Sequence, residues 1–111
     1  MTWQRRVATF ARQRGLLHDP VVHALDLAAE VGEIAKAVLE AVEYGSTSFQ
    51  TTADLRAEIG DALYSLLALA EACDVDAGEA LEEALAKYER RLAETGQARS
   101  RSATRNPQST M

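Results

Sequence analysis

Two stretches of eight residues, which repeat one pattern 28 positions apart, constrain the fold of this chain most strongly. They are DLAAEVGE at residues 26–33 and DLRAEIGD at residues 54–61. In each stretch apolar residues recur at helical spacing, and two acids stand three positions apart, which on an α-helix places both acids on one face. The pattern therefore predicts two long helices, each with an acid pair at the edge of an apolar stripe.

The acid pairs are Glu30 with Glu33 and Glu58 with Asp61. If the two helices pack through their apolar stripes, the four carboxylates share one rim, and each close pair of like charges would repel by about 1 to 4 kcal/mol. Because a domain has only about 5 to 15 kcal/mol of net stability, such a cluster needs a neutralising partner. Hard divalent cations such as Mg²⁺ suit carboxylate oxygens best. The alternative, solvated surface acids, is the usual interpretation of one pair and is less favoured for two equivalent pairs.

A helical projection places each acid pair beside an apolar arc. The first arc contains Leu27, Val31, Ile34, Val38 and Val42, and the second contains Leu55, Ile59, Ala62, Leu63 and Leu66. We expect these arcs to pack together. Gly32 and Gly60, each between the two acids of a pair, cost roughly 1 kcal/mol apiece in helix propensity. Either close approach of another helix or room for a substrate would account for them.

Helical patterns and their boundary signals extend over most of the chain. Amphipathic spacing predicts helices at residues 3–14, about 20–44, about 54–73 and about 77–94. Asp19 before Pro20, Thr51 with Asp54, and Asp76 with Glu79 are typical helix-start signals. Since no stretch alternates as a strand would, we expect an all-α four-helix domain at residues 1–96, closed by Gly96, and a disordered tail at residues 97–111.

Composition narrows the classes of partner. The chain has 17 acidic residues against 12 basic ones, which argues against nucleic-acid binding because phosphate neutralisation needs a basic face. Cys73 is the single cysteine, so an intrachain disulfide is excluded. No segment approaches the roughly 20 apolar residues of a membrane span, and we expect a cytoplasmic protein. A chain of 111 residues builds only a modest core, so association with itself would help.

The segment AEVGE, followed by a 24-residue gap and EIGD, resembles the EExxE and ExxD motifs of the MazG-like all-α nucleoside triphosphate pyrophosphohydrolases. The resemblance runs over residues 3–92 and includes HDPVVHALDLAAEVGEI and LAKYERRL, although Ala29 replaces the first acid of the motif. It implies Mg²⁺, with Mn²⁺ as a possible substitute, bound by Glu30, Glu33, Glu58 and Asp61. Hydrolysis of (d)NTPs to (d)NMP and pyrophosphate would follow, with Glu30 or Glu33 taking the proton of the attacking water. A role in cleaning the nucleotide pool and a homodimer or homotetramer are further implications.

Other candidate substrate contacts have alternative explanations. Lys87 and Arg91 match a phosphate-contacting segment of the family, but they would also serve as helix-end charges. His18 stands where some relatives line the substrate pocket, although a loop or capping histidine is the favoured interpretation. Trp3 and Phe10 would either stack on a base or pack in the core. From a different class, a non-catalytic helical interaction module with acidic stripes is the alternative function.

Overall fold

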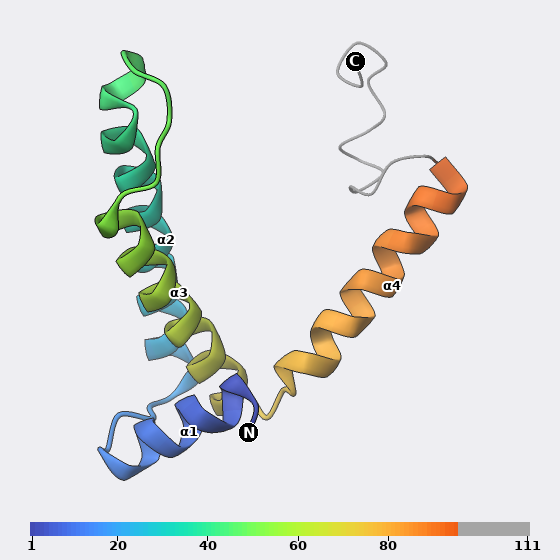
Figure 1. The fold of residues 1–111 in the computed structure, drawn as a ribbon. Helices are drawn as coiled ribbons and strands as arrows, with labels where there is room; N and C mark the ends of the chain where they lie inside the picture. The colour runs from blue at the N-terminus through green and yellow to red at the C-terminus, as the bar shows by residue number, and fades with distance from the viewer. Residues whose placement is uncertain (96–111) are drawn as a thin grey trace. The chain divides into compact units, whose positions relative to one another are not determined.

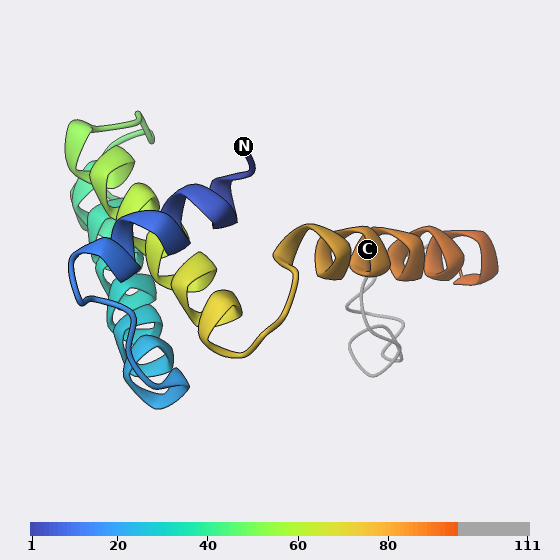
Figure 2. The same cartoon turned by 90° about the horizontal axis from the view of Figure 1, so that it is seen from below.

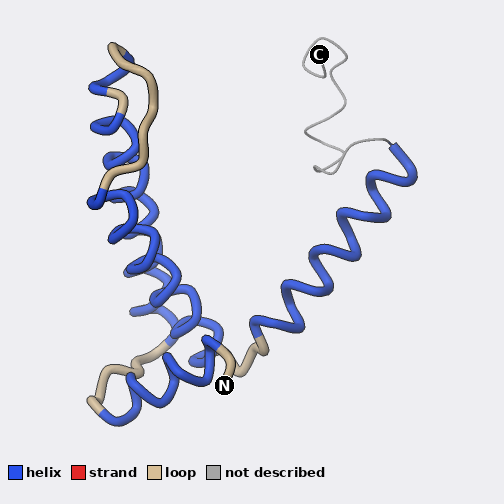
Figure 3. Tube along the Cα trace, viewed as in Figure 1, coloured by secondary structure: helices blue, strands red, loops and turns tan. Residues whose placement is uncertain are grey.

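The computed structural model describes residues 1–95 as helices joined by short connections (Figures 1 and 3). The elements are α1 (Trp3–Gln13), α2 (Pro20–Ala41), the short 3₁₀ turn η1 (Glu43–Gly45), α3 (Ala53–Ala72) and α4 (Ala77–Thr95). No strand occurs between residues 1 and 95, so the all-α prediction with four helices is confirmed for this part of the chain. The predicted tail and the predicted helix end at Gly96 lie outside the described residues.

The chain divides into two compact units, Met1–Ala77 and Gly78–Met111. In the first unit α2 and α3 lie side by side and run antiparallel, and α1 packs against α3 (Figures 1 and 2). The second unit contains nearly all of α4. The extent of the predicted domain, residues 1–96, stays a prediction.

Helix starts follow local side-chain chemistry, with two corrections to the sequence expectations. Thr52 caps α3, since its Oγ1 accepts a hydrogen bond from the backbone N–H of Leu55 at 3.1 Å. The cap is therefore one residue later than the predicted Thr51. Pro20 occupies the first turn of α2 as expected, but the side chain of Asp19 makes no capping hydrogen bond.

The end of α2 was predicted near Tyr44, and this prediction was wrong by three residues. The helix ends at Ala41 because the backbone turns left-handed, with φ of 49° at Glu43, 57° at Tyr44 and 96° at Gly45. The carbonyl of Val42 accepts hydrogen bonds from the backbone N–H groups of Gly45, Ser46 and Thr47, at 3.0, 3.0 and 3.1 Å. Left-handed backbone costs a non-glycine residue about 1 to 2 kcal/mol, so periodicity alone does not forecast this turn.

Small side chains build most of the core of the first unit. The buried apolar residues are Ala8, Ala11, Ala37, Leu55, Ala62, Leu67, Ala68 and Ala70. The predicted apolar arcs are only partly correct, because Leu55 and Ala62 are buried whereas Val31, Ile59 and Leu66 are 54%, 51% and 47% exposed. The two helices are thus rotated about their axes relative to the projected arcs, and several large apolar side chains of the arcs are exposed.

Gln4 joins α1 to the far end of α3. Its Nε2 donates hydrogen bonds to Glu71 Oε1 at 3.1 Å and to the Val75 carbonyl at 2.8 Å, and its Oε1 accepts one from the Ala77 backbone N–H at 2.7 Å. Arg12 forms an ion pair with Glu71 at 2.7 Å. Hydrogen bonds from Arg12, then from Gln4, hold the pKa of Glu71 below its ordinary value. One amide thus satisfies three partners that are distant in sequence.

Replacing Gln4 by alanine should lower the free energy of unfolding by about 1 to 3 kcal/mol, because three hydrogen bonds are lost together. Urea denaturation followed by circular dichroism measures the change. Gln13→Ala, an exposed glutamine at the other end of α1, is the matched control and should stay within about 0.5 kcal/mol of wild type. Equal effects of the two substitutions would contradict the role given to Gln4.

Candidate metal centre

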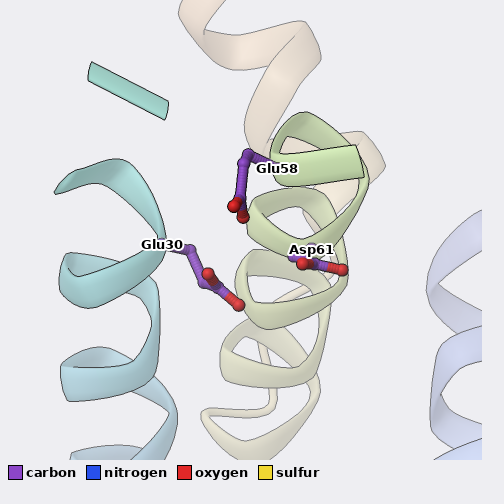
Figure 4. A group of neighbouring side chains, drawn as sticks. All are labelled: Glu30, Glu58 and Asp61. Carbon is purple, nitrogen blue, oxygen red and sulfur yellow. The ribbon is translucent and has the colours of Figure 1, made fainter. Parts of the chain in front are cut away.

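Three carboxylates meet between α2 and α3. Glu30 comes from α2, and Glu58 and Asp61 come from one face of α3; one oxygen from each lies within 4.8 Å of the others. Figure 4 shows Glu30 and Glu58 reaching into the space between the two helices. Glu30 and Glu58 are half-buried and Asp61 is exposed. Three oxygen donors from two antiparallel helices form a ligand set that suits a hard cation.

Helical register places these side chains. On α2, Glu30 stands seven residues from both His23 and Ala37, which are buried, so all three share the face toward α3. On α3, Glu58 lies between Leu55 and Ala62, which are also buried. Glu30 and Glu58 therefore stand on faces that are otherwise packed, and solvent reaches these two acids only in part.

The acids around Glu58 raise its proton affinity. The pKa of Glu58 is raised above its ordinary 4.5, first by desolvation and then by the charges of Glu33, Asp61, Glu30 and Asp54. Each of these influences disfavours the carboxylate form. A bound cation would reverse them, so the donor set and its charge fit a divalent metal ion.

The sequence predicted four metal ligands, and the structure brings three of them together. Glu33, the fourth predicted ligand, is not among the three carboxylates that meet. Its side chain is exposed on α2. Its charge is nevertheless the strongest among the acids that raise the pKa of Glu58. An open hollow of about 410 Å³ adjoins the cluster and is lined by Asp26, Ala29, Glu30, Asp61, Tyr64 and Ser65.

A second, mostly apolar pocket of about 340 Å³ opens between α1 and α3. It is lined by Trp3, Arg6, Val7, Phe10, Gly60, Leu63, Tyr64 and Leu67. Phe10 and Tyr64 meet edge to face with their ring centroids 6.0 Å apart. Tyr64 also lines the hollow beside the carboxylates, so the two spaces share a wall. Sequence reasoning did not single out Tyr64 for this site, although its position three residues after Asp61 was an available signal.

The other predicted substrate contacts, His18, Lys87 and Arg91, are not among the residues that line the two spaces. His18 is exposed, and its backbone N–H donates a 2.9 Å hydrogen bond to Nε2 of the buried His23. The lining of the hollow and of the apolar pocket does not include His18. Lys87 and Arg91 lie on α4, in the second unit, with their charged groups 5.4 and 6.0 Å from the ring centroid of Tyr88.

These observations define an all-α protein with a candidate divalent-cation centre between two antiparallel helices. Residues 22–95 match the family model of the MazG nucleotide pyrophosphohydrolase domain. Because this match covers well over half of the chain, the protein belongs to the MazG family, as the sequence motifs predicted. No curated protein and no solved structure matches the chain.

Membership of the family points to a nucleotide pyrophosphohydrolase, in a family that generally depends on divalent metal ions. Within the described residues, none of the helices combines the length and apolar character needed to cross a membrane.

Proposed function

We propose that this protein hydrolyses nucleoside triphosphates, deoxynucleotides included, to the monophosphate and pyrophosphate, with Mg²⁺ held by Glu30, Glu33, Glu58 and Asp61. The observation that carries the proposal is the meeting of three of these carboxylates in a chain of the MazG family. Mn²⁺ accepts the same oxygen donors and would substitute. Cleaning of the cytoplasmic nucleotide pool, without a nucleic-acid partner, is the biological role proposed.

The carboxylate cluster fits both the cation and the charge of the substrate. Mg²⁺ is typically held by one or two carboxylates and by substrate phosphates, and Glu58 and Asp61 on α3 oppose Glu30 on α2. When bound, the cation would supply charge screening for the triphosphate and Lewis acidity at the reacting phosphorus. Without it, the acids of the cluster would repel the phosphates.

The chain's own acids would move the proton. Direct attack by water on the α-phosphorus needs no protein nucleophile, but it needs a group that accepts the proton of that water. Glu30 stands inside the cluster and Glu33 stands exposed beside it, so this pair on α2 is the proposed base. Which of the two accepts the proton is a question for the pH dependence of the single variants.

The apolar pocket is the proposed site for the nucleobase. It adjoins the hollow at the cluster through Tyr64, and aromatic rings such as Trp3 and Phe10 offer stacking surfaces. Lys87 and Arg91 stay proposed phosphate contacts because they are cations one turn apart on α4. His18 stays a proposed substrate contact, and the homodimer or homotetramer stays a prediction.

Pyrophosphate release from a panel of NTPs and dNTPs, measured with Mg²⁺, with Mn²⁺ and with EDTA, tests this function. We expect equal amounts of monophosphate and pyrophosphate, complete loss of release in EDTA, and recovery when Mg²⁺ is added in excess. Orthophosphate in place of pyrophosphate would contradict cleavage between the α and β phosphates. No product from any triphosphate would favour the non-catalytic helical interaction module.

A further inference from the structure

We infer that Arg6 selects the base of the nucleotide and that the preferred base is guanine. Arg6 lies on α1 and lines the apolar pocket together with Trp3, Phe10 and Tyr64. It is the charged residue of that lining. Selection of the base by Arg6 rests on the proposed function, because that function places the base in this pocket.

Helical register places Arg6 beside the pocket. The residues of α1 that line the pocket are spaced like one face of a helix: Trp3, Arg6, Val7 and Phe10. Solubility does not require a cation in this apolar stripe, because α1 already carries other arginines outside it. The guanidinium of Arg6 therefore stands where a ligand in the pocket would meet it.

The other arginines of α1 are held by neighbours or border another space. Arg12 has an acidic ion-pair partner 2.7 Å away, and the guanidinium carbon of Arg14 lies 4.0 Å from the ring centroid of Phe10. Arg5 borders a separate, more polar hollow. In the described part of the chain, the guanidinium of Arg6 has neither a hydrogen bond nor an ion pair. Its N–H donors are therefore available to a ligand.

The polar side chains of the pocket are mainly hydrogen-bond donors. Arg6 and the indole of Trp3 donate and do not accept, whereas the hydroxyl of Tyr64 does both. Of the described residues that line the pocket, none is an acid or a side-chain amide. An amino group of a base beside Arg6 would leave donors without an acceptor, and sites with unpaired polar groups reject such a ligand.

Tyr64 sets the direction in which a bound nucleotide would lie. It lines both the hollow at the carboxylates and the apolar pocket, whereas the residues from α1 line the pocket alone. With its phosphates at the carboxylates, a nucleotide would therefore turn the edge of its base that is far from the sugar toward Arg6. Guanine has two acceptors on that side, O6 and N7, which an arginine binds together. Adenine and cytosine have an amino group there, and thymine has a single acceptor.

Trp3 offers the open stacking surface for this base. Its side chain is 66% exposed, whereas the ring of Phe10 is covered on one face by Arg14 and meets Tyr64 edge to face. Trp3 is also the single tryptophan of the chain. Its fluorescence therefore reports the stacking of a base in the pocket.

Steady-state hydrolysis of dGTP, dATP, dITP and 7-deaza-dGTP is the first test. We expect kcat/KM for dGTP to be at least about tenfold above that for dATP. The value for dITP, which keeps O6 and N7, should match that for dGTP, and the value for 7-deaza-dGTP, which lacks N7, should fall by about fivefold or more.

Substitution of Arg6 tests whether this side chain makes the choice. Arg6→Ala should bring dGTP and dATP to similar kcat/KM, and Arg6→Gln should shift the preference toward dATP because an amide pairs with N6 and N7 of adenine. Arg5→Ala is the matched control, since Arg5 is the adjacent exposed arginine and borders the other hollow. It should keep the preference of wild type for dGTP.

Quenching of Trp3 fluorescence by dGMP and by dAMP tests the same recognition without hydrolysis. We expect the dissociation constant of wild type for dGMP to be at least about tenfold below that for dAMP, and the two to be similar in Arg6→Ala. If this difference appears without turnover of any triphosphate, Arg6 selects guanine and the proposed hydrolysis is wrong. Turnover of dGTP and dATP with equal kcat/KM, or indistinguishable titrations of wild type with the two mononucleotides, would overturn the selection by Arg6.

Discussion

Replacing Glu58 by glutamine is expected to reduce pyrophosphate release by at least about 100-fold and, at the same time, to stabilise the metal-free protein. Loss of a group that only supports a metal ligand typically lowers metal affinity or activity by about 10- to 100-fold. Loss of a ligand itself should therefore lower activity by at least about 100-fold. Stability should change in the opposite direction because desolvation and neighbouring acids make the Glu58 carboxylate unfavourable, as its raised pKa shows. Glutamine keeps the shape and removes the charge.

The pH dependence of stability provides a second measurement for the same variant. Because the pKa of Glu58 in the folded protein is raised above the ordinary 4.5, the folded state binds the proton more tightly than the unfolded state. The free energy of unfolding of the metal-free protein should therefore fall as pH rises from about 4.5 through the raised pKa. Glu58→Gln should lose this part of the pH dependence, and Mg²⁺ should stabilise wild type more than the variant.

Glu40→Gln is the matched control, since Glu40 is an exposed glutamate of α2 ten residues beyond Glu30. It should leave turnover, Mg²⁺ affinity and the pH dependence of unfolding near wild type. If Glu58→Gln kept full activity, the proposed metal centre would be wrong. If activity fell but metal-free stability fell as well, the carboxylate would have a packing role that its surroundings do not suggest.

Helix positions follow from the sequence because their signals are local. Thr52 and Pro20 act within one turn of the helices they begin, so the sequence predicted these starts to within a residue or two. The end of α2 was missed because Glu43 and Tyr44 take left-handed backbone, which neither side chain favours. The glycine that signals such a turn comes only after them, at Gly45.

The orientation of the helices about their own axes does not follow from periodicity. α2 is apolar on two sides, so the projection of one sequence does not reveal which side meets α3. The predicted arc included Val31, which is 54% exposed, whereas the buried side of α2 is marked by His23 and Ala37. The buried residues on this side are a histidine and an alanine, and both contribute little to an apolar projection.

The same rotation explains how much of the candidate site was predictable. Residues three apart on a helix share a face, but they differ by about 60° around its axis. Glu58 and Asp61 both reach the cluster from α3, while on α2 the face of His23 and Ala37 carries Glu30 and leaves Glu33 beside the group. Spacing thus identified the acid pairs, and helix rotation determined which members meet.

Gly60→Leu is expected to raise the KM for the preferred triphosphate by at least about tenfold while leaving Mg²⁺ affinity close to wild type. Gly60 lines the apolar pocket with Trp3, Phe10 and Tyr64, and a Cβ built there meets no atom within 4 Å. A leucine side chain would therefore extend into open space and occupy the volume proposed for the base. A misfit of this size in a binding pocket is typically worth tenfold or more in kcat/KM.

Stability separates this result from simple damage to the fold. Leucine and alanine both favour helices over glycine, so Gly60→Ala and Gly60→Leu should each raise the free energy of unfolding by about 0.5 to 1 kcal/mol. Gly60→Ala is the matched control, because one methyl group leaves most of the pocket open and should change KM little. A variant that is more stable, binds metal and yet binds nucleotide poorly would locate the base between α1 and α3. Unchanged kinetics in Gly60→Leu would instead assign the pocket to packing and leave the base to be sought elsewhere on the protein.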